Sequence, residues 1–135
     1  VKSVDWESVM NVNAIAPLLL TQKIISNLRL GNARKLVYVT SKMGSIEDNR
    51  GGGSYIYRSS KTALNSVVRS LSVDLREEDF SVAVLHPGWV RTDMGGPSGL
   101  IDVTTSVAGM MSVIEGLSPA GSGQFFNYDG SIIPW

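Results

Sequence analysis

The chain has 135 residues, about the size of one ordinary domain. Its 12 Lys and Arg balance its 12 Asp and Glu, so no overall charge attracts it to nucleic acid or to an acidic membrane surface. The absence of cysteine excludes disulfides and thiolate chemistry, and no apolar run approaches the roughly 20 residues that cross a bilayer. We therefore expect a cytoplasmic protein without nucleic-acid or membrane partners.

The first predicted element is a helix over residues 5–29, where apolar residues recur at helical spacing and acidic residues occupy the opening turn. Pro17 lies inside it and cannot donate a hydrogen bond to the carbonyl group of Asn13, so a kink is the simplest expectation. Residues 35–41, KLVYVTS, are short, β-branched and almost wholly apolar. They predict a strand that is buried on both faces.

A polar, glycine-rich loop over residues 42–53 leads into a second predicted helix at 55–76. The remaining elements are a buried strand, a mobile loop, a third helix and a final strand, at residues 80–88, 91–100, 107–117 and 123–130. Helices and strands therefore alternate along the chain. This order predicts an α/β protein with a parallel sheet, crossover helices and a single structural unit, 1–135.

Tyr57 and Lys61 are four residues apart, which places both side chains on one face of the second helix. A phenol has a pKa of about 10 and exchanges protons poorly at neutral pH unless a nearby cation stabilises the phenolate. Lys61 could supply that cation, although this spacing also occurs on many helices by chance. Tyr55 is a rival, but it lies six residues from Lys61 on a diverging face.

Ser41 ends the strand 35–41, and ligands of α/β sheets bind beyond the carboxyl ends of strands. The next loop leads directly to Tyr57, so the serine hydroxyl and the phenol can meet over one substrate oxygen. The simpler alternative is that Ser41 forms a turn before Gly44. The glycines at 51–53 lack the preceding strand and the spacing of a phosphate-binding loop. We therefore interpret them as a flexible connection that lets the loop from Ser41 reach Tyr57.

Four further side chains are weaker candidates for the site. His86 is the only histidine, and neither a carboxylate pattern nor a second ligand accompanies it, so we expect a packed strand-end residue and no metal site. Met43, Trp89 and Met94 could form an apolar substrate wall, and each could equally belong to the core.

The runs TSKMG, YRSSK and LHPGWVRTDM, in this order, resemble the core of the short-chain dehydrogenase/reductase family. The matching positions are Ser41, Tyr57, Lys61, Pro87, Gly88 and Thr92. The run NVNAIAP resembles the family's fourth active-site element, which maps onto Asn13. The SKMGS run and the ending GQFFNYDGSIIPW are similar to the carbonyl reductase branch that includes sniffer-like and C-factor-like proteins. The resemblance covers nearly the whole chain.

The resemblance implies a catalytic role for each matched residue. Tyr57 would be the general acid in carbonyl reduction or the base in alcohol oxidation, and Ser41 would hydrogen-bond the substrate oxygen. Lys61 would stabilise the phenolate and hold the nicotinamide ribose, while the Asn13 carbonyl group would anchor a water that passes protons to Lys61. The nicotinamide would be lined by Pro87, Gly88, Val90 and Thr92. Without the resemblance, these last positions are typical of a strand-ending turn.

The resemblance also implies an NAD(P)(H)-dependent oxidoreductase with a small carbonyl or alcohol substrate, with NADPH favoured over NADH. The chain would be the C-terminal, catalytic half of a Rossmann-like doubly wound fold, without the N-terminal cofactor-binding half; its start at Val1 suggests a segment of something longer. Strand 35–41 would then expose an apolar edge, and helices 5–29 and 55–76 would form a homo-oligomer. The alternative is a non-catalytic fragment that acts in interaction or signalling.

Overall fold

A three-stranded parallel sheet forms the centre of the chain, in a computed structural model that describes residues 1–135. Its strands are β1 (Lys35–Val39), β2 (Ser81–His86) and β3 (Gln124–Asn127), in the order β1-β2-β3. Parallel neighbours require crossover connections, and each crossover here carries a helix. The expected Rossmann-like α/β class is confirmed.

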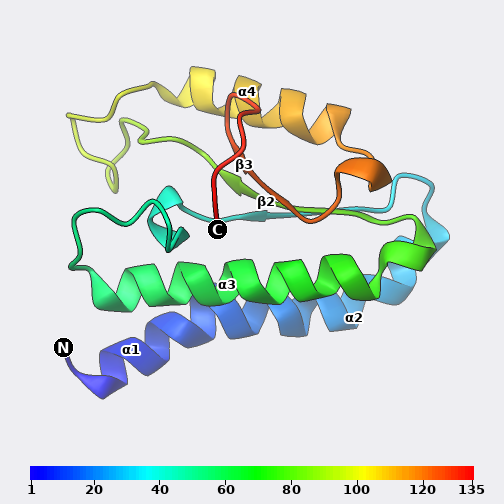
Figure 1. The fold of residues 1–135 in the computed structure, drawn as a ribbon, viewed down its shortest axis with the longest axis horizontal. Helices are drawn as coiled ribbons and strands as arrows, with labels where there is room; N and C mark the ends of the chain where they lie inside the picture. The colour runs from blue at the N-terminus through cyan, green and yellow to red at the C-terminus, as the bar shows by residue number, and fades with distance from the viewer.

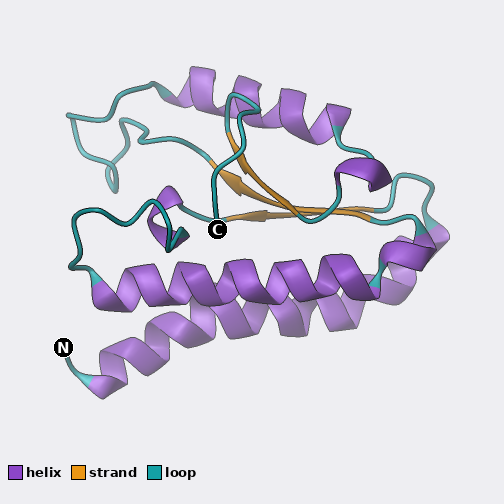
Figure 2. Ribbon diagram, viewed as in Figure 1, coloured by secondary structure: helices purple, strands orange, loops and turns teal.

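Helices cover the sheet on two sides (Figures 1 and 2). The helices are α1 (Ser3–Met10), α2 (Ala16–Leu30), α3 (Tyr55–Asp74) and α4 (Val103–Gly116). In Figure 1, α4 lies on one side of the sheet, and α3 lies on the other side together with α1 and α2. None of these helices is long and apolar enough to span a membrane.

The N-terminal helix departs from the expected single helix with a kink at Pro17. A π-helical turn, Asn11–Ile15, separates α1 from α2, and the N–H of Ala16 bonds to the carbonyl group of Asn11, five residues earlier. Pro17 then occupies the first turn of α2, where its missing N–H costs least. The irregularity therefore lies just before the proline rather than at it.

Helix α4 begins four residues earlier than the expected start at residue 107. Asp102 Oδ1 accepts a hydrogen bond of 2.7 Å from the backbone N–H of Thr105, which caps the first turn. The capping aspartate was present in the sequence, but the run of Val and Thr after it has only modest helix propensity. Residues 91–100 form the expected irregular segment between β2 and α4.

The hydrophobic core lies between the sheet and α3. Its buried members are Leu36, Leu64, Val68, Leu75, Phe80, Val82, Val84, Phe125 and Ile133. Strand β2 is buried along most of its length, as expected. For β1 the expected burial on both faces is wrong: Val39 is 55% exposed, because β1 is one of the two edge strands of this sheet.

Candidate active site

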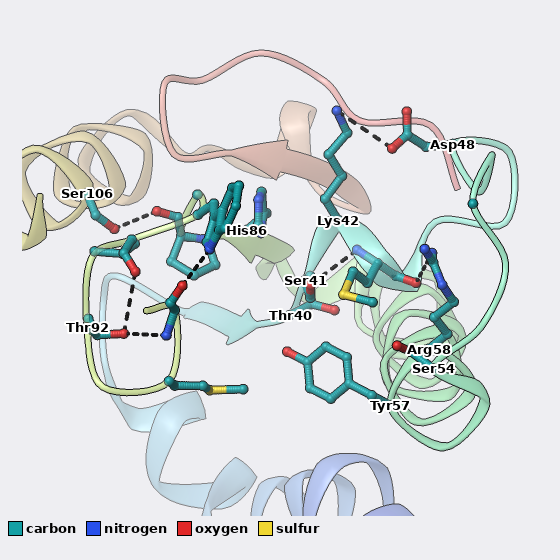
Figure 3. A pocket seen from close by; sticks show the side chains of 18 of the residues that line it. Thr40, Ser41, Lys42, Asp48, Ser54, Tyr57, Arg58, His86, Thr92 and Ser106 are labelled. Atoms are coloured by element: carbon teal, nitrogen blue, oxygen red, sulfur yellow. Dashed lines mark hydrogen bonds and ion pairs between the residues drawn. The ribbon is translucent and has the colours of Figure 1, made fainter. Parts of the chain in front are cut away.

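A cavity of about 880 Å³ opens at the carboxyl ends of β1 and β2. Pockets that bind small molecules commonly have volumes of about 300–1,000 Å³. Six of the eight predicted site residues line this cavity: Ser41, Tyr57, Pro87, Gly88, Val90 and Thr92. Figure 3 shows the ring of Tyr57 reaching from α3 toward the segment that carries Ser41.

Ser41 combines the two interpretations that the sequence left open. Its Oγ accepts a hydrogen bond of 3.1 Å from the N–H of Met43, which caps a short 3₁₀ turn at Lys42–Gly44. It therefore forms the turn before Gly44, and it also lines the cavity. Because Oγ accepts from the backbone, its own proton is available to a ligand.

The 3₁₀ turn after Ser41 packs directly on α3 through Gly44. A Cβ at Gly44 would lie 2.9 Å from the backbone carbon and the Cβ of Lys61, so a larger residue would push the turn away from the helix. The carbonyl group of Gly44 accepts a hydrogen bond of 2.8 Å from Thr62 Oγ1. This contact positions Ser41 relative to the helix that carries Tyr57 and Lys61.

Asn65 makes a second connection between the end of β1 and α3. Its Oδ1 accepts a hydrogen bond of 2.6 Å from Thr40 Oγ1, and both residues are buried. Sequence reasoning missed these supporting residues, because Gly44, Thr62 and Asn65 look like ordinary turn and helix positions. Thr62 and Asn65 follow Lys61 by one and four residues, so they lie on the same side of α3 as Lys61. This spacing is the only sign of their role in the sequence.

Lys61 lies beneath the Tyr57 ring rather than in the cavity. Its Nζ is 5.9 Å from the ring centroid and donates a hydrogen bond of 3.3 Å to the carbonyl group of Val39. Burial lowers the pKa of Lys61. Tyr55, the rival tyrosine, is 67% exposed and lies outside the cavity lining.

Asn13 also lies outside the cavity lining. Its side-chain Nδ2 donates a hydrogen bond of 3.0 Å to Oγ of Ser60, which is fully buried. Ser60 Oγ in turn donates a hydrogen bond of 2.8 Å to the carbonyl group of Tyr57. The π-helical turn that carries Asn13 is therefore attached to the turn of α3 between Tyr57 and Lys61.

The segment after β2 forms the far wall of the cavity. Its first carbonyl group, on Pro87, accepts a hydrogen bond of 2.6 Å from Ser106 Oγ of α4. Gly88 has a φ of +87°, and a Cβ there would lie 2.6 Å from Cδ1 of Ile101, so packing within the protein requires glycine. Thr92 Oγ1 accepts a hydrogen bond of 3.0 Å from the N–H of Gly95.

His86 lines the cavity, but its Nδ1 is buried and has no hydrogen-bond partner. Burial, with a smaller contribution from the charge of Lys42, lowers the pKa of His86 to about 4. The imidazole is therefore neutral near pH 7. No cluster of His, Cys, Asp or Glu that could hold a metal ion accompanies it.

Comparison with known proteins places the chain in a family. The family model described as short chain dehydrogenase matches residues 1–100. C-signal of Myxococcus xanthus is 50% identical over 131 residues, which cover 97% of this chain and 79% of that protein. The 1-hydroxy-2-glutathionyl-2-methyl-3-butene dehydrogenase of Rhodococcus sp. is 35% identical, over 100% of this chain and 62% of that protein.

Solved structures agree with this placement. The carbonyl reductase Sniffer of D. melanogaster superimposes with a TM-score of 0.96 at 36% identity, over 100% of this chain and 59% of that chain. The NADPH-bound carbonyl reductase from chicken fatty liver gives a TM-score of 0.91 at 36% identity, with the same coverage of 100% and 59%. This chain thus spans about three fifths of these two structures and of the Rhodococcus dehydrogenase, and about four fifths of C-signal. The family match, the identities and the shared fold together show that the chain belongs to the short chain dehydrogenase family of oxidoreductases.

Proposed function

We propose that the protein containing this chain transfers hydride between a nicotinamide cofactor, preferably NADPH, and a small carbonyl or alcohol substrate. One observation carries the proposal: Ser41 and Tyr57 line the same cavity, and the Lys61 ammonium lies 5.9 Å from the Tyr57 ring centroid. The NADPH described for the similar chicken carbonyl reductase supports the choice of cofactor.

In the reducing direction, Tyr57 donates its phenolic proton to the carbonyl oxygen of the substrate. Ser41 donates a hydrogen bond to the same oxygen, which holds it in place and stabilises the negative charge that develops there. The nearby positive charge of Lys61 stabilises the phenolate that remains.

Lys61 and Asn13 are proposed to return the proton to Tyr57. Burial lowers the pKa of Lys61, so its ammonium releases a proton more readily than an exposed lysine. Pro17 has no N–H, so the carbonyl group of Asn13 lacks its α-helical donor, and we propose that this oxygen holds a water molecule. The bond from Asn13 to Ser60 keeps this oxygen close to the turn that carries Lys61.

The residues of the far wall fit a nicotinamide ring. Pro87, Gly88 and Val90 offer an apolar and partly backbone surface, and Thr92 offers a hydroxyl for the carboxamide. When bound, the cofactor supplies the hydride. The chain, 1–135, acts as one catalytic unit in this proposal. The part of the similar structures that the chain does not cover would then bind the rest of the dinucleotide.

The alternative of a non-catalytic interaction or signalling fragment is not favoured. The relative from Myxococcus xanthus carries the name C-signal, but the other relatives and structures named above are a dehydrogenase and carbonyl reductases. The cavity also retains the tyrosine, serine and Pro-Gly segment together.

The test is a pair of tyrosine variants in the longer protein, assayed by oxidation of NADPH with an aldehyde. Tyr57→Phe removes only the phenolic hydroxyl, and with it the acidic proton, so we expect kcat to fall by about 10²–10⁴-fold. Tyr55→Phe is the matched control and should keep the wild-type rate. Undiminished turnover in Tyr57→Phe, with both variants folded, would refute this assignment of the acid.

A further inference from the structure

The two walls of the cavity differ in charge. The far wall, after β2, contributes Trp89, Val90 and Met94, and no charged residue of that segment lines the cavity. The opposite wall, between β1 and α3, contributes the charged residues Lys42, Asp48, Arg50 and Arg58. Three cations and one anion therefore face the cavity in a chain whose formal net charge is zero.

Contacts within the protein engage most of these charges. Lys42 Nζ lies 3.6 Å from Asp48 Oδ2. Arg58 donates from Nη1 to the carbonyl group of Met43 and from Nε to that of Gly52, both at 3.3 Å. Arg50 is exposed, and its guanidinium forms neither a hydrogen bond nor an ion pair with the protein.

The loop that presents Arg50 is held on both sides of this residue. Before it, the N–H of Glu47 bonds to the carbonyl group of Trp135 at 3.0 Å. After it, the N–H of Gly52 bonds to Asn49 Oδ1 at 2.9 Å, and Arg58 holds the Gly52 carbonyl group. The position of the Arg50 backbone on the cavity wall is therefore defined, while its guanidinium remains free for a ligand.

We propose that the substrate is a carbonyl compound with an anionic group, such as a carboxylate, which Arg50 binds. The planar guanidinium can bind a carboxylate through two hydrogen bonds, and the net charge of the charged wall favours an anion. The apolar body of the substrate packs on Trp89 and Met94 across the cavity. This inference names the substrate class of the proposed reductase and therefore rests on the proposed function.

The test measures binding, so it does not depend on turnover. The chain is titrated calorimetrically with 4-carboxybenzaldehyde and with its neutral methyl ester. We expect the acid to bind about five- to tenfold more tightly, because one charge-assisted contact at a partly exposed site is worth about 1 kcal/mol. Raising the salt from 0.1 M to 1 M shortens the screening length from about 10 Å to about 3 Å and should reduce this preference.

Two arginine variants test whether Arg50 causes the preference for the acid over the ester. Arg50→Gln should remove it and leave the affinity for the ester unchanged. Arg76→Gln is the matched control, because Arg76 is also exposed and lies outside the cavity lining. Equal affinity for acid and ester in the wild type, binding of neither, or an undiminished preference in Arg50→Gln would each overturn the inference.

A third ligand distinguishes a substrate anion from a cofactor phosphate. Nicotinamide mononucleotide carries both the nicotinamide ring and a phosphate. If Arg50→Gln weakens binding of this compound and leaves that of the acid unchanged, Arg50 serves the cofactor and the inference is wrong. If the acid preference is present but Tyr57→Phe keeps full activity, the proposed reaction fails while the anion site stands.

Discussion

Strands β1 and β2 are neighbours in the same sheet, yet they differ in environment. Leu85 of β2 is 1% exposed, whereas Val39, its register partner on β1, is 55% exposed. Both strands are short, and each contains two valines. The difference arises because β2 has a strand on each side, while β1 has a free edge.

The difference shows which parts of this chain are held and covered by contacts within the chain, and which apolar surfaces the chain leaves exposed. The cavity is built on the end of β2, on α3 and on the turn that Gly44 packs against α3, and each of these is held by contacts within the chain. The edge of β1 and the outer side of α2 have apolar residues without a cover; Leu19 and Leu20 are both exposed. An exposed strand edge and an exposed apolar face both favour association with another surface.

The largest expected effect is on stability, and it tests the comparison directly. Leu85→Ala should lower the free energy of unfolding by about 2–5 kcal/mol, because it leaves a cavity in the packed interior. Val39→Ala should change it by less than about 0.5 kcal/mol, because the side chain is already half exposed. Urea denaturation of the chain measures both. Similar losses in the two variants would contradict the distinction between the strands.

The pH dependence of stability tests the burial at the end of β2. Folding lowers the pKa of His86 from 6.5 to about 4, so between these values the unfolded chain binds a proton that the folded chain does not. The free energy of unfolding should therefore rise with pH across this window, by about 2 kcal/mol after allowance for the partial exposure of the imidazole, and this contribution should be constant above it. Chemical denaturation at a series of pH values measures the slope.

His86→Gln is the control for this slope, since its side chain does not titrate. Carboxylates such as Asp102 titrate in both proteins, so the difference between wild type and variant isolates the histidine. A pH dependence that survives unchanged in His86→Gln would show that the imidazole is not the group responsible.

Self-association tests whether the exposed apolar side of α2 forms an interface. We expect the chain to form oligomers through the helix pair 5–29 and 55–76, and Leu19→Glu should weaken this association by about tenfold or more, because it places a charge on the apolar face. Val107→Glu changes a similarly exposed apolar residue of α4 and should have little effect. Sedimentation of the three proteins decides. A wild-type chain that is monomeric at all concentrations would refute the expected interface.

The smallest expected effect concerns the contact between the two helices of the site. Asn13→Ala removes the hydrogen bond to buried Ser60 and should cost about 1 kcal/mol of stability. Asn11→Ala is the matched control, because Asn11 is exposed and lies in the same π-helical turn. Thermal unfolding compares them. Equal shifts would mean that the bond to Ser60 does not attach this turn to α3.

The sequence by itself determined most of the elements and which residues are candidates for the site. Hydrophobic periodicity and strand length predicted the alternation of helices and parallel strands, because these patterns follow from local geometry. The four-residue spacing of Tyr57 and Lys61 placed both on one face of α3 for the same reason. The short apolar runs also predicted that Ser41 and Pro87 each lie at the end of a strand, and the structure brings both to one cavity.

Only the tertiary structure decided the relations that depend on contacts between distant segments. The packing of Gly44 on Lys61, the bond from Asn13 to Ser60 and the place of the unengaged Arg50 guanidinium on the cavity wall have no sequence signature, since each depends on where another segment lies. The composition of strand 35–41 likewise could not predict the exposure of Val39, because apolar composition records the preference of a strand for burial but not whether a neighbour covers it; only the family resemblance indicated an exposed edge there.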